Sequence, residues 1–379
     1  MSKPNYLQLF GCSMFFWAAL AGAETGVTAK TITLGQSAAL SGPAQELGQG
    51  MRDGAQAYFD MVNAQGGVAG RQITLKTLDD GYEAERAASN TRALSGKDGV
   101  FALFGYVGTA TSNAALPLVR KEGIPFFAPY TGAQSLREPL DHYIFHVRAS
   151  YAQEMDRIVE HATTLAMSKI AVLYQNDAYG QAGLESIQRA LAKRNIAVLG
   201  VATVERNSSE VKAAVAALRR LQPQAVVMVS AYTSSAAFIK EMHKGGGTMP
   251  VFWNISFVGS EALVHELGAD ARGIMISQVM PAPWDDINPV IKEYHQWYVG
   301  KHGHTASYVS VEGFIAAKVL VEGLRRTGAN LTREGLIRAL EGMGTYHTGG
   351  FDVKFSSQSH NGSDFIDLTV VGRDGRFMH

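Results

Sequence analysis

The chain has 379 residues, of which 46% are hydrophobic and 18% are charged, and its 34 basic residues balance 34 acidic ones. This length exceeds that of one compact core, so we expect two domains, and the composition is that of a folded globular protein. The even charge excludes the basic face that nucleic-acid binding needs and the polybasic patch that attracts a membrane surface.

The N-terminal segment has the pattern of a secretory signal peptide. Lys3 is its only charge, an apolar stretch follows at 15–20, and the small residues at 21–23 fit a cleavage site. The apolar run falls well short of the roughly 20 residues that span a bilayer, which disfavours a membrane anchor. Cys12, the single cysteine, lies in this segment, so the exported chain has no disulfide and no thiolate. We predict a periplasmic protein that is cleaved near Ala23.

From residue 31 onward the chain alternates short apolar runs with helical patterns. We expect strands at 31–36, 73–78, 100–104, 125–128, 169–174, 197–204, 225–230, 250–253, 273–277, 351–355 and 365–371. We expect helices at 49–64, 83–95, 110–122, 151–166, 181–194, 209–220, 233–244, 259–267, 288–302, 306–326 and 332–342. Strands this apolar, separated by helices, are typical of parallel sheets that are covered on both faces. The predicted fold class is therefore α/β with doubly wound topology.

Two such units are indicated. The stretches 44–57 and 178–188 both place glycines at the start of a major helix, just after a strand and a loop. A crossover between the units is expected at 144–151, and a second near the prolines at 281 and 283, which break regular structure. Short crossovers suit a hinge between two lobes.

The sequence offers little support for catalysis. The glycines within 48–54 begin more than ten residues after their strand and are spaced wrongly for a dinucleotide fingerprint. No G-x-S-x-G elbow and no Walker loop occurs, and His302 and His304 lie in a polar stretch that is typical of a solvated loop. We expect no metal, no cofactor and no enzyme activity, and an exported enzyme is the least favoured alternative.

Hydroxyl groups and tyrosines follow the predicted strands at their carboxyl ends, where open α/β sheets bind ligands. Thr109 and Thr111 fall where the third strand meets a helix N-terminus, whose free amides attract an anion such as a carboxylate. Residues 130–132 follow the next strand, and Tyr179 and Tyr232 follow two strands of the second unit. Each is compatible with simple capping or edge packing, but together they predict a polar cleft that closes over a small molecule.

Four motifs, taken in order, resemble the leucine/isoleucine/valine-binding protein family, the type I periplasmic solute-binding proteins of ABC importers. They are ALSGP at 39–43, NAQGGVAGR at 63–71, DD at 79–80 and DAYG at 177–180. The resemblance covers about residues 30–370 and implies two lobes that are joined by three crossovers and close on the ligand. The expected division is a signal peptide at 1–23, lobe 1 at 28–148 plus 281–355, and lobe 2 at 149–280 plus 356–379.

The resemblance also implies a ligand site. Carried over by position, its residues are Thr109, Tyr130, Thr131, Gly132, Tyr179, Tyr232, Ser256 and Leu47. Thr109 matches a serine that takes the ligand carboxylate, and 130–132 match a segment that holds the carboxylate and the ammonium. Two positions depart from the family: Gly132 replaces a threonine and leaves only backbone groups there, and Ser256 replaces the acidic residue that holds the α-ammonium. A preference for α-amino acids therefore does not follow from the sequence.

The leading hypothesis is a periplasmic binding protein that delivers a small carboxylate-bearing solute, a branched-chain amino acid or a related acid, to the membrane permease of an ABC importer. An alternative is a flytrap that reports its ligand to a membrane receptor. Another is an importer component for aromatic or non-amino carboxylic acids, which Tyr130 and Trp253 would suit if both reach the cleft.

Overall fold

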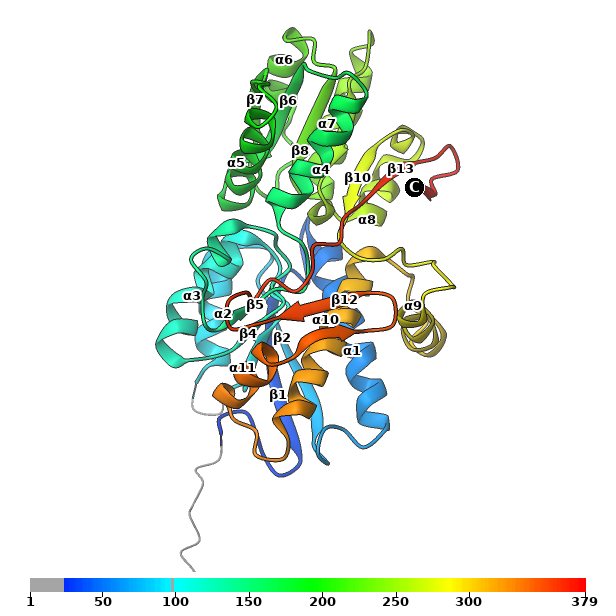
Figure 1. Cartoon of the computed structure of the whole chain (residues 1–379). Helices are drawn as coiled ribbons and strands as arrows, with labels where there is room; N and C mark the ends of the chain where they lie inside the picture. The colour runs from blue at the N-terminus through cyan, green and yellow to red at the C-terminus, as the bar shows by residue number, and fades with distance from the viewer. Residues whose placement is uncertain (1–23, 97–98) are drawn as a thin grey trace, which may run out of the picture.

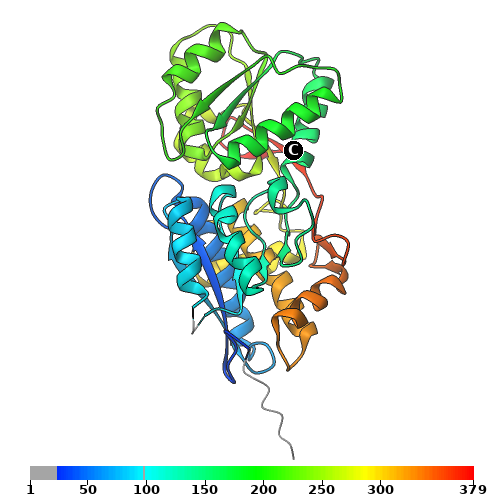
Figure 2. The same ribbon diagram turned by 90° about the vertical axis from the view of Figure 1, so that its left-hand side faces the viewer.

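The protein, described by a computed structural model, consists of two α/β lobes stacked end to end (Figures 1 and 2). The structure describes residues 24–96 and 99–379. The predicted signal peptide and Cys12 lie outside the described residues. Within those ranges, no helix combines the length and apolar character that crossing a bilayer requires.

The first lobe is built on a five-stranded parallel sheet in the order β2-β1-β3-β4-β5. Its strands are β1 (Thr31–Ala38), β2 (Gln72–Asp79), β3 (Ala102–Phe104), β4 (Phe126–Phe127) and β5 (Ile144–Phe145). Its helices are α1 (Gln45–Ala64), α2 (Ala84–Leu94), α3 (Thr109–Glu122), α9 (Pro289–Tyr294), α10 (Tyr308–Thr327) and α11 (Arg333–Glu341), with a 3-10 turn at Gln134–Leu136 and a π-helical stretch at His295–Lys301. A hairpin of β11 (Gly344–His347) and β12 (Asp352–Phe355) completes it.

The second lobe is built on a seven-stranded sheet in the order β14-β13-β10-β9-β8-β6-β7. Its parallel strands are β6 (Ile170–Gln175), β7 (Gly200–Val204), β8 (Ala225–Val229), β9 (Val251–Asn254) and β10 (Met275–Gln278). The antiparallel strands β13 (Asp367–Val371) and β14 (Phe377–Met378) extend one edge. Its helices are α4 (Tyr151–Thr164), α5 (Ala178–Ala192), α6 (Lys212–Arg220), α7 (Tyr232–Lys244) and α8 (Ser260–Leu267), with 3-10 turns at Ser256–Val258 and Gly268–Ala271.

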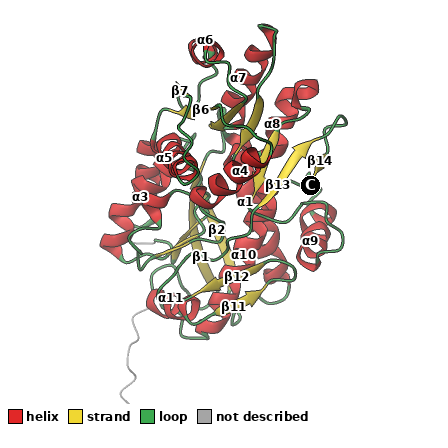
Figure 3. Ribbon diagram, turned by 45° about the horizontal axis from the view of Figure 1, so that its top comes forward, coloured by secondary structure: helices red, strands yellow, loops and turns green. Residues whose placement is uncertain are grey.

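The predicted fold class is confirmed. Both sheets have the 2-1-3-4-5 order of doubly wound folds, and helices flank the strands of each lobe (Figure 3). The chain passes between the sheets three times, after β5, after β10 and after β12. The connection from β12 to β13 is visible in Figure 1 as the red loop that rises from the hairpin to the second lobe.

Some local predictions were wrong. Residues 144–145, assigned to a crossover, form the edge strand β5, and the hairpin partner β11 and the last strand β14 were not expected. The helix predicted over 288–302 is α-helical only at Pro289–Tyr294 and continues as π-helix. These elements are short or lie at sheet edges, where the hydrophobic pattern carries little information.

Glycines allow α1 and α10 to pack at close range. A Cβ atom on Gly54 would lie 2.0 Å from the carbonyl oxygen of Ser310, and one on Gly313 would lie 2.3 Å from the carbonyl oxygen of Met51. A Cβ atom on Gly48 would lie 1.9 Å from the carbonyl oxygen of Ala39, just after β1. The glycines of α1 therefore serve backbone packing, and this packing fixes α10, with Glu312 in its second turn, against the first lobe.

Candidate functional site

The carboxyl ends of the two parallel sheets face each other between the lobes. Thr109 begins α3 just after β3, Tyr179 lies in the first turn of α5 after β6, and Tyr232 begins α7 after β8. In each sheet these positions border the point where the strand order reverses, between strands 1 and 3 of the 2-1-3-4-5 order. Ligands of doubly wound folds bind at this point.

On the first lobe, hydroxyl groups gather at the N-terminus of α3. The Oγ1 atoms of Thr109 and Thr131 lie 2.7 Å apart, and Thr131 Oγ1 donates to the Tyr151 hydroxyl at 3.2 Å. The residue before α3 is Gly108, which has no side chain to cap the free N–H groups of the first turn. We call Thr109, Thr131 and Tyr151 the hydroxyl end of the site. A helix N-terminus with adjacent hydroxyls suits an anion such as a carboxylate.

Tyr151 explains why glycine occupies position 132. A Cβ atom on Gly132 would lie 2.5 Å from Tyr151 Cδ1 and 2.6 Å from the Tyr151 backbone nitrogen, which donates to the Gly132 carbonyl at 2.8 Å. The tyrosine ring thus fills the space of the missing side chain. Residue 132 itself offers only backbone groups, and the Tyr151 hydroxyl stands beside the neighbouring Thr131. Sequence reasoning placed Tyr151 merely at a helix start and missed it.

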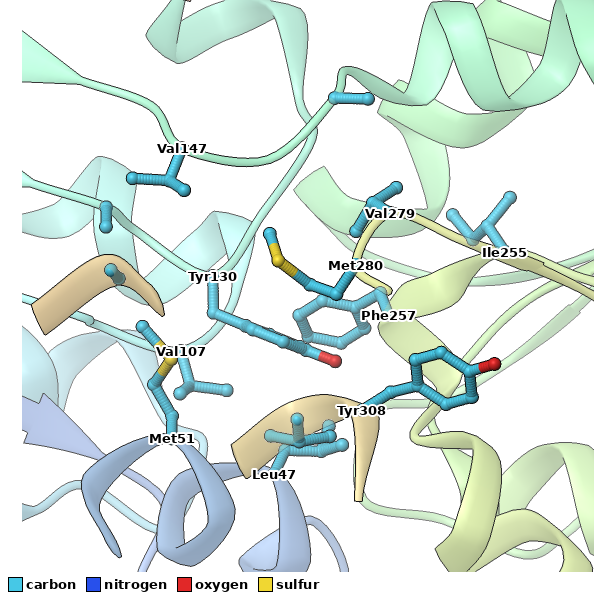
Figure 4. Close-up of a cluster of buried hydrophobic side chains, with 14 of the residues drawn as sticks. Leu47, Met51, Val107, Tyr130, Val147, Ile255, Phe257, Val279, Met280 and Tyr308 are labelled. Carbon is cyan, nitrogen blue, oxygen red and sulfur yellow. The ribbon is translucent and has the colours of Figure 1, made fainter. Parts of the chain in front are cut away.

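Aromatic rings form the wall between the two lobes. The ring of Phe257, from the second lobe, lies 5.3 Å from that of Tyr130 and 4.4 Å from that of Tyr179. Tyr179 in turn lies 5.5 Å from the ring of Tyr151. Figure 4 shows Tyr130 against Phe257, with Met280 and Tyr308 beside them. The hydroxyl of Tyr179 is buried and has no hydrogen-bond partner among the described residues.

Ser256 lies at the opposite end of this wall and binds a buried carboxylate. Its backbone N–H donates to Glu154 Oε2 at 2.8 Å, and its Oγ donates to Glu154 Oε1 at 3.1 Å. The Ser277 hydroxyl also donates to Glu154 Oε2, at 2.6 Å. Tyr130 contacts the same residue from the first lobe, since its hydroxyl donates to the Ser256 carbonyl at 3.3 Å. Position 256 itself has no acid, but α4 brings one to it.

Arg148, in the first crossover, and Glu312, on α10, extend this cluster. Arg148 Nη2 donates to Ser256 Oγ, Arg148 Nε lies 3.5 Å from Glu312 Oε1, and the guanidinium lies 4.3 Å from the centre of the Tyr130 ring. Arg148 is 1% exposed and Glu312 is 3% exposed. We call Arg148, Glu154, Ser256 and Glu312 the charged end of the site.

Burial controls the pKa values at the charged end. It raises the pKa of Glu312 to about 7, although Arg148 favours the ionised form, and it raises the pKa of Glu154 for the same reason. Burial opposes the charge of Arg148, but Glu312, Tyr130 and Glu154 outweigh it, so the pKa of Arg148 is raised. The arginine therefore stays charged, whereas the two carboxylates remain easier to protonate than exposed ones even beside it.

A cavity of about 10 Å³ lies at the charged end, which is room for about one water. Its polar lining consists of Tyr130, Arg148, Ser256, Gln278, Tyr308 and Glu312. Trp253 does not line it, and its ring lies 5.3 Å from that of His161 of α4, so the condition that both Tyr130 and Trp253 reach the site is met only by Tyr130. A larger hollow of about 670 Å³ lies at the amino ends of β8 and β9, the opposite edge of that sheet from the site.

Leu47, from the first lobe, and Tyr232, from the second, are both buried where the lobes meet. Both approach Gly259: a Cβ atom there would lie 2.5 Å from Leu47 Cδ2 and 3.7 Å from Tyr232 Cδ1. Beside them, Thr233 Oγ1 donates to the Pro43 carbonyl across the lobes at 2.7 Å. Six of the eight predicted site residues thus form one cluster, which is connected by contacts of Tyr151 and Phe257. The other two, Leu47 and Tyr232, lie beside Gly259.

The residues that sequence reasoning missed are Arg148, Tyr151, Glu154, Phe257 and Glu312. One signal was available for Glu312, since it is the only acid in the apolar stretch 308–317, whose other residues are apolar, glycine or serine. A lone charge inside a buried helix needs a partner or a ligand. The others had no local signal, because their neighbours in space come from different elements.

Comparisons with known proteins agree with this architecture. The model of a periplasmic binding protein family matches residues 31–376. The structure of a substrate-binding periplasmic protein from Ralstonia solanacearum is 34% identical, with a TM-score of 0.87 over 92% of this chain and 99% of that one. The structure of a possible leucine/isoleucine/valine-binding protein from Rhodopirellula baltica SH 1 is 31% identical, with a TM-score of 0.88 over 94% of this chain and 98% of that one. Leu/Ile/Val-binding protein homolog 3 of Brucella melitensis is 22% identical over 82% of this chain and 83% of its own length.

Proposed function

Because this chain belongs to the periplasmic binding protein family, we propose that it is the periplasmic solute-binding component of an ABC importer. It binds a small carboxylate-bearing solute between its lobes and delivers it to the membrane permease subunits. Two relatives bear the name of leucine/isoleucine/valine-binding proteins, which supports a branched-chain amino acid or a related acid as the solute.

The observation that supports this proposal best is that both lobes contribute side chains to the site, and that these side chains differ in chemistry. The first lobe supplies Thr109 and Thr131 at the N-terminus of α3, and the second lobe supplies Tyr151, Tyr179 and Phe257. Contacts such as Tyr130 to Ser256 and Gln175 Nε2 to the Tyr82 hydroxyl, at 3.3 Å each, cross between the lobes. A solute that contacts both lobes only when they are closed favours the closed state, which is the form a permease can recognise.

In this proposal the lobes are rigid bodies with the division given by the sequence. Lobe 1 comprises 28–148 and 281–355, and lobe 2 comprises 149–280 and 356–379. The solute carboxylate contacts Thr109, Thr131 and the free N–H groups of α3, and Leu47 and Tyr232 lie where the lobes meet. The cavity of about 10 Å³ is too small for such a solute. The lobes therefore have to move apart when the solute enters.

The aromatic wall favours a second candidate solute. Rings from both lobes, among them Tyr130, Tyr179 and Phe257, lie 4.4 to 5.3 Å apart at an angle of 44°, and a flat ligand gains from contact with such rings. Aromatic carboxylic acids therefore belong in the same binding test as leucine.

The test is a thermal-shift screen of the purified protein, followed by calorimetric titration of each stabilising compound. The panel contains leucine, isoleucine, valine, phenylalanine, their deaminated analogues and benzoate-type acids, since binding to the folded state raises the melting temperature. We expect at least one carboxylate to stabilise the protein. If no member of the panel shifts the melting temperature, the proposed solute class is wrong.

Thr109→Val then tests the site. It keeps the shape of the side chain and removes the hydroxyl, and we expect affinity for the carboxylate to fall about tenfold, which is the value of one hydrogen bond to a charged group. The matched control is Thr111→Val, because the Thr111 hydroxyl donates to the carbonyls of Val107 and Gly108, just before the helix. Equal affinities in the two variants would remove Thr109 from the site.

Uptake separates an importer from a receptor-linked sensor. Deleting the gene should abolish transport of the labelled solute into cells, and fractionation should recover the protein from the periplasm. Unchanged uptake would favour the sensor.

A further inference from the structure

Carboxylates reach the charged end from elements that lie far from Ser256 in the sequence. The resemblance places the acid for a ligand ammonium at position 256, where this chain has serine. Glu154 of α4 binds both the backbone N–H and the hydroxyl of that serine, and Glu312 of α10 lines the same cavity as Ser256. The negative charge that position 256 lacks is therefore present around it.

Of these two carboxylates, Glu312 is the one free to contact a ligand. Glu154 already accepts three hydrogen bonds, from Ser256 and Ser277. Glu312 is 3% exposed and accepts no hydrogen bond from the described residues, and its ion-pair partner Arg148 lies 3.5 Å away at Nε. A buried carboxylate with unfilled acceptor capacity is costly unless another donor completes it, and the cavity is the open side of this one.

Charge is distributed unevenly along the site. At the charged end, two carboxylates face one guanidinium, so one cation and two anions leave a net charge of −1 when both are ionised. At the hydroxyl end, the buried Arg137 donates from Nη2 to the Thr131 carbonyl at 3.4 Å, behind the N-terminus of α3. The hydroxyl end is therefore poised for an anion. The charged end offers Glu312 as an acceptor for a cation, beside Arg148, whose Nε and Nη1 atoms lack hydrogen-bond partners among the described residues. This arrangement matches a zwitterion whose ammonium contacts Glu312.

We propose that Glu312 receives the cationic group of the solute and thereby replaces the acid that is missing at position 256. This inference rests on the proposed function and narrows it: the solute is a zwitterion that carries an ammonium as well as a carboxylate. Arg148 holds Glu312 in place and limits its reach, so it acts as a positioning residue.

The proposal changes which lobe recognises the ammonium. Position 256 belongs to the second lobe, whereas Glu312 lies on α10, which packs on α1 of the first lobe. The first lobe then holds both polar ends of the solute, through Thr109 and Thr131 at one end and Glu312 at the other. The second lobe contributes the rings of Tyr179 and Phe257 when it closes.

The experiment compares each amino acid with its own deaminated analogue by calorimetric titration. The pairs are leucine with 4-methylpentanoate and phenylalanine with 3-phenylpropionate, titrated into the wild-type protein and into Glu312→Gln. In the wild type we expect one amino acid to bind about 10- to 100-fold more tightly than its analogue, which is the value of a charge-assisted hydrogen bond. In Glu312→Gln that ratio should fall close to one, while the affinity for the analogue is retained.

Two further variants serve as controls for this titration. Glu293→Gln is the matched control, since it makes the same change at a carboxylate paired with Lys318 of the same helix, outside the cavity, and should leave the ratio unchanged. Glu312→Asp keeps the charge and should keep part of the preference. Retained affinity for the deaminated acid shows that a variant is folded.

The outcomes separate the two proposals. A deaminated acid that binds the wild type as well as its amino acid, or a preference that survives Glu312→Gln, overturns the role of Glu312 and leaves a carboxylate-binding protein whose Arg148–Glu312 pair is structural. If neither member of either pair binds, the proposed solute class fails, and the role of Glu312 fails with it.

Discussion

The two ends of the site are built in different ways. The hydroxyl end consists of neutral groups, and two of them, Thr109 and Thr131, follow adjacent strands of one sheet within 22 positions of each other. The charged end combines a crossover residue, Arg148, with carboxylates from α4 and α10 that lie 158 positions apart, at 154 and 312. The comparison teaches that residues on consecutive strand-to-helix loops, such as Thr109 and Thr131, can be predicted from the sequence, whereas residues brought in from the other lobe, such as Tyr151 and Glu154, cannot.

The ends also differ in energetic character. Each hydrogen bond at the hydroxyl end contributes about 1 kcal/mol net, because a neutral group exchanges one partner for another. The charged end contains ions that are removed from water, so its members depend on one another and the loss of one exposes the full cost of the others. Substitutions at the two ends should therefore differ in size.

The largest effect is expected for Arg148→Ala. Removing the guanidinium leaves Glu312 and Glu154 buried without a cation between them, and breaking a buried pair in this way costs about 3 to 5 kcal/mol. Urea unfolding at pH 7.5 measures the loss. Adding Glu312→Gln to Arg148→Ala should recover part of it, because the uncompensated charge is then removed.

If Arg148→Ala lowers the free energy of unfolding by less than about 1 kcal/mol, the energetic difference between the two ends is contradicted, because that value is typical of an exposed ion pair. The charged end would then be energetically no different from the hydroxyl end.

The next effect is expected at the hydroxyl end, for Gly132→Ala. The added methyl group would meet Tyr151 at 2.5 Å on its ring and at 2.6 Å on its backbone nitrogen, and the backbone contact cannot be relieved by a rotamer change. Overpacking of this kind costs about 1 to 3 kcal/mol, and displacement of Tyr151 should also weaken ligand binding. Thermal unfolding and titration with the best carboxylate measure both effects.

Gly300→Ala is the control for this substitution. A Cβ atom there would lie 3.4 Å from the nearest atom, the His295 carbonyl oxygen, in a helical stretch, so stability should be unchanged or slightly higher. Equal stability of the two variants would show that Tyr151 does not fill the space at position 132.

The fold was predictable because apolar runs and helical periods are local signals. The parallel strands from β1 to β10, except the edge strand β5, coincide with predicted runs, and the alternation of strand and helix predicts the doubly wound class, although not the strand order. The strand-end positions of Thr109, Tyr130 and Tyr179 were predictable for the same reason. Short edge elements such as β11 and β14 were not, since pairing rather than sequence pattern makes them strands.

The charged end could not be predicted, because the sequence does not show which residue a charged side chain will pair with in the fold. In the sequence, Arg148 and Glu154 look like surface residues at the start of an amphipathic helix. Both side chains are buried because the crossover after β5 places this helix start between the lobes. Ser256 was noticed as an absent acid, but where the replacement lies depends on how α10 packs against α1. That packing follows from backbone contacts at glycines such as Gly54 and Gly313, whose partners cannot be read from either helix alone.

The smallest effect concerns pH and again separates the two ends. Burial raises the pKa of Glu312 from 4.5 to about 7 in the folded protein, so the folded state holds this proton more tightly than the unfolded chain does. The corresponding stability is fully present below about pH 4.5 and is lost as the pH rises through 7. Between pH 6 and pH 8, one group with a pKa of 7 accounts for about 1.4 kcal/mol of the free energy of unfolding.

Other groups titrate in the same range, so the informative quantity is the difference between the wild type and Glu312→Gln at each pH. Burial lowers the pKa of His146, which makes acid destabilising, and burial raises the pKa of Asp80 to about 6, which acts in the opposite sense. Both contributions are shared by the two proteins and cancel. Thr109→Val, at the neutral end, should run parallel to the wild type across this range. If Glu312→Gln also runs parallel, Arg148 already holds Glu312 ionised below pH 6, and the charged end carries its full negative charge throughout the range in which a cationic ligand binds.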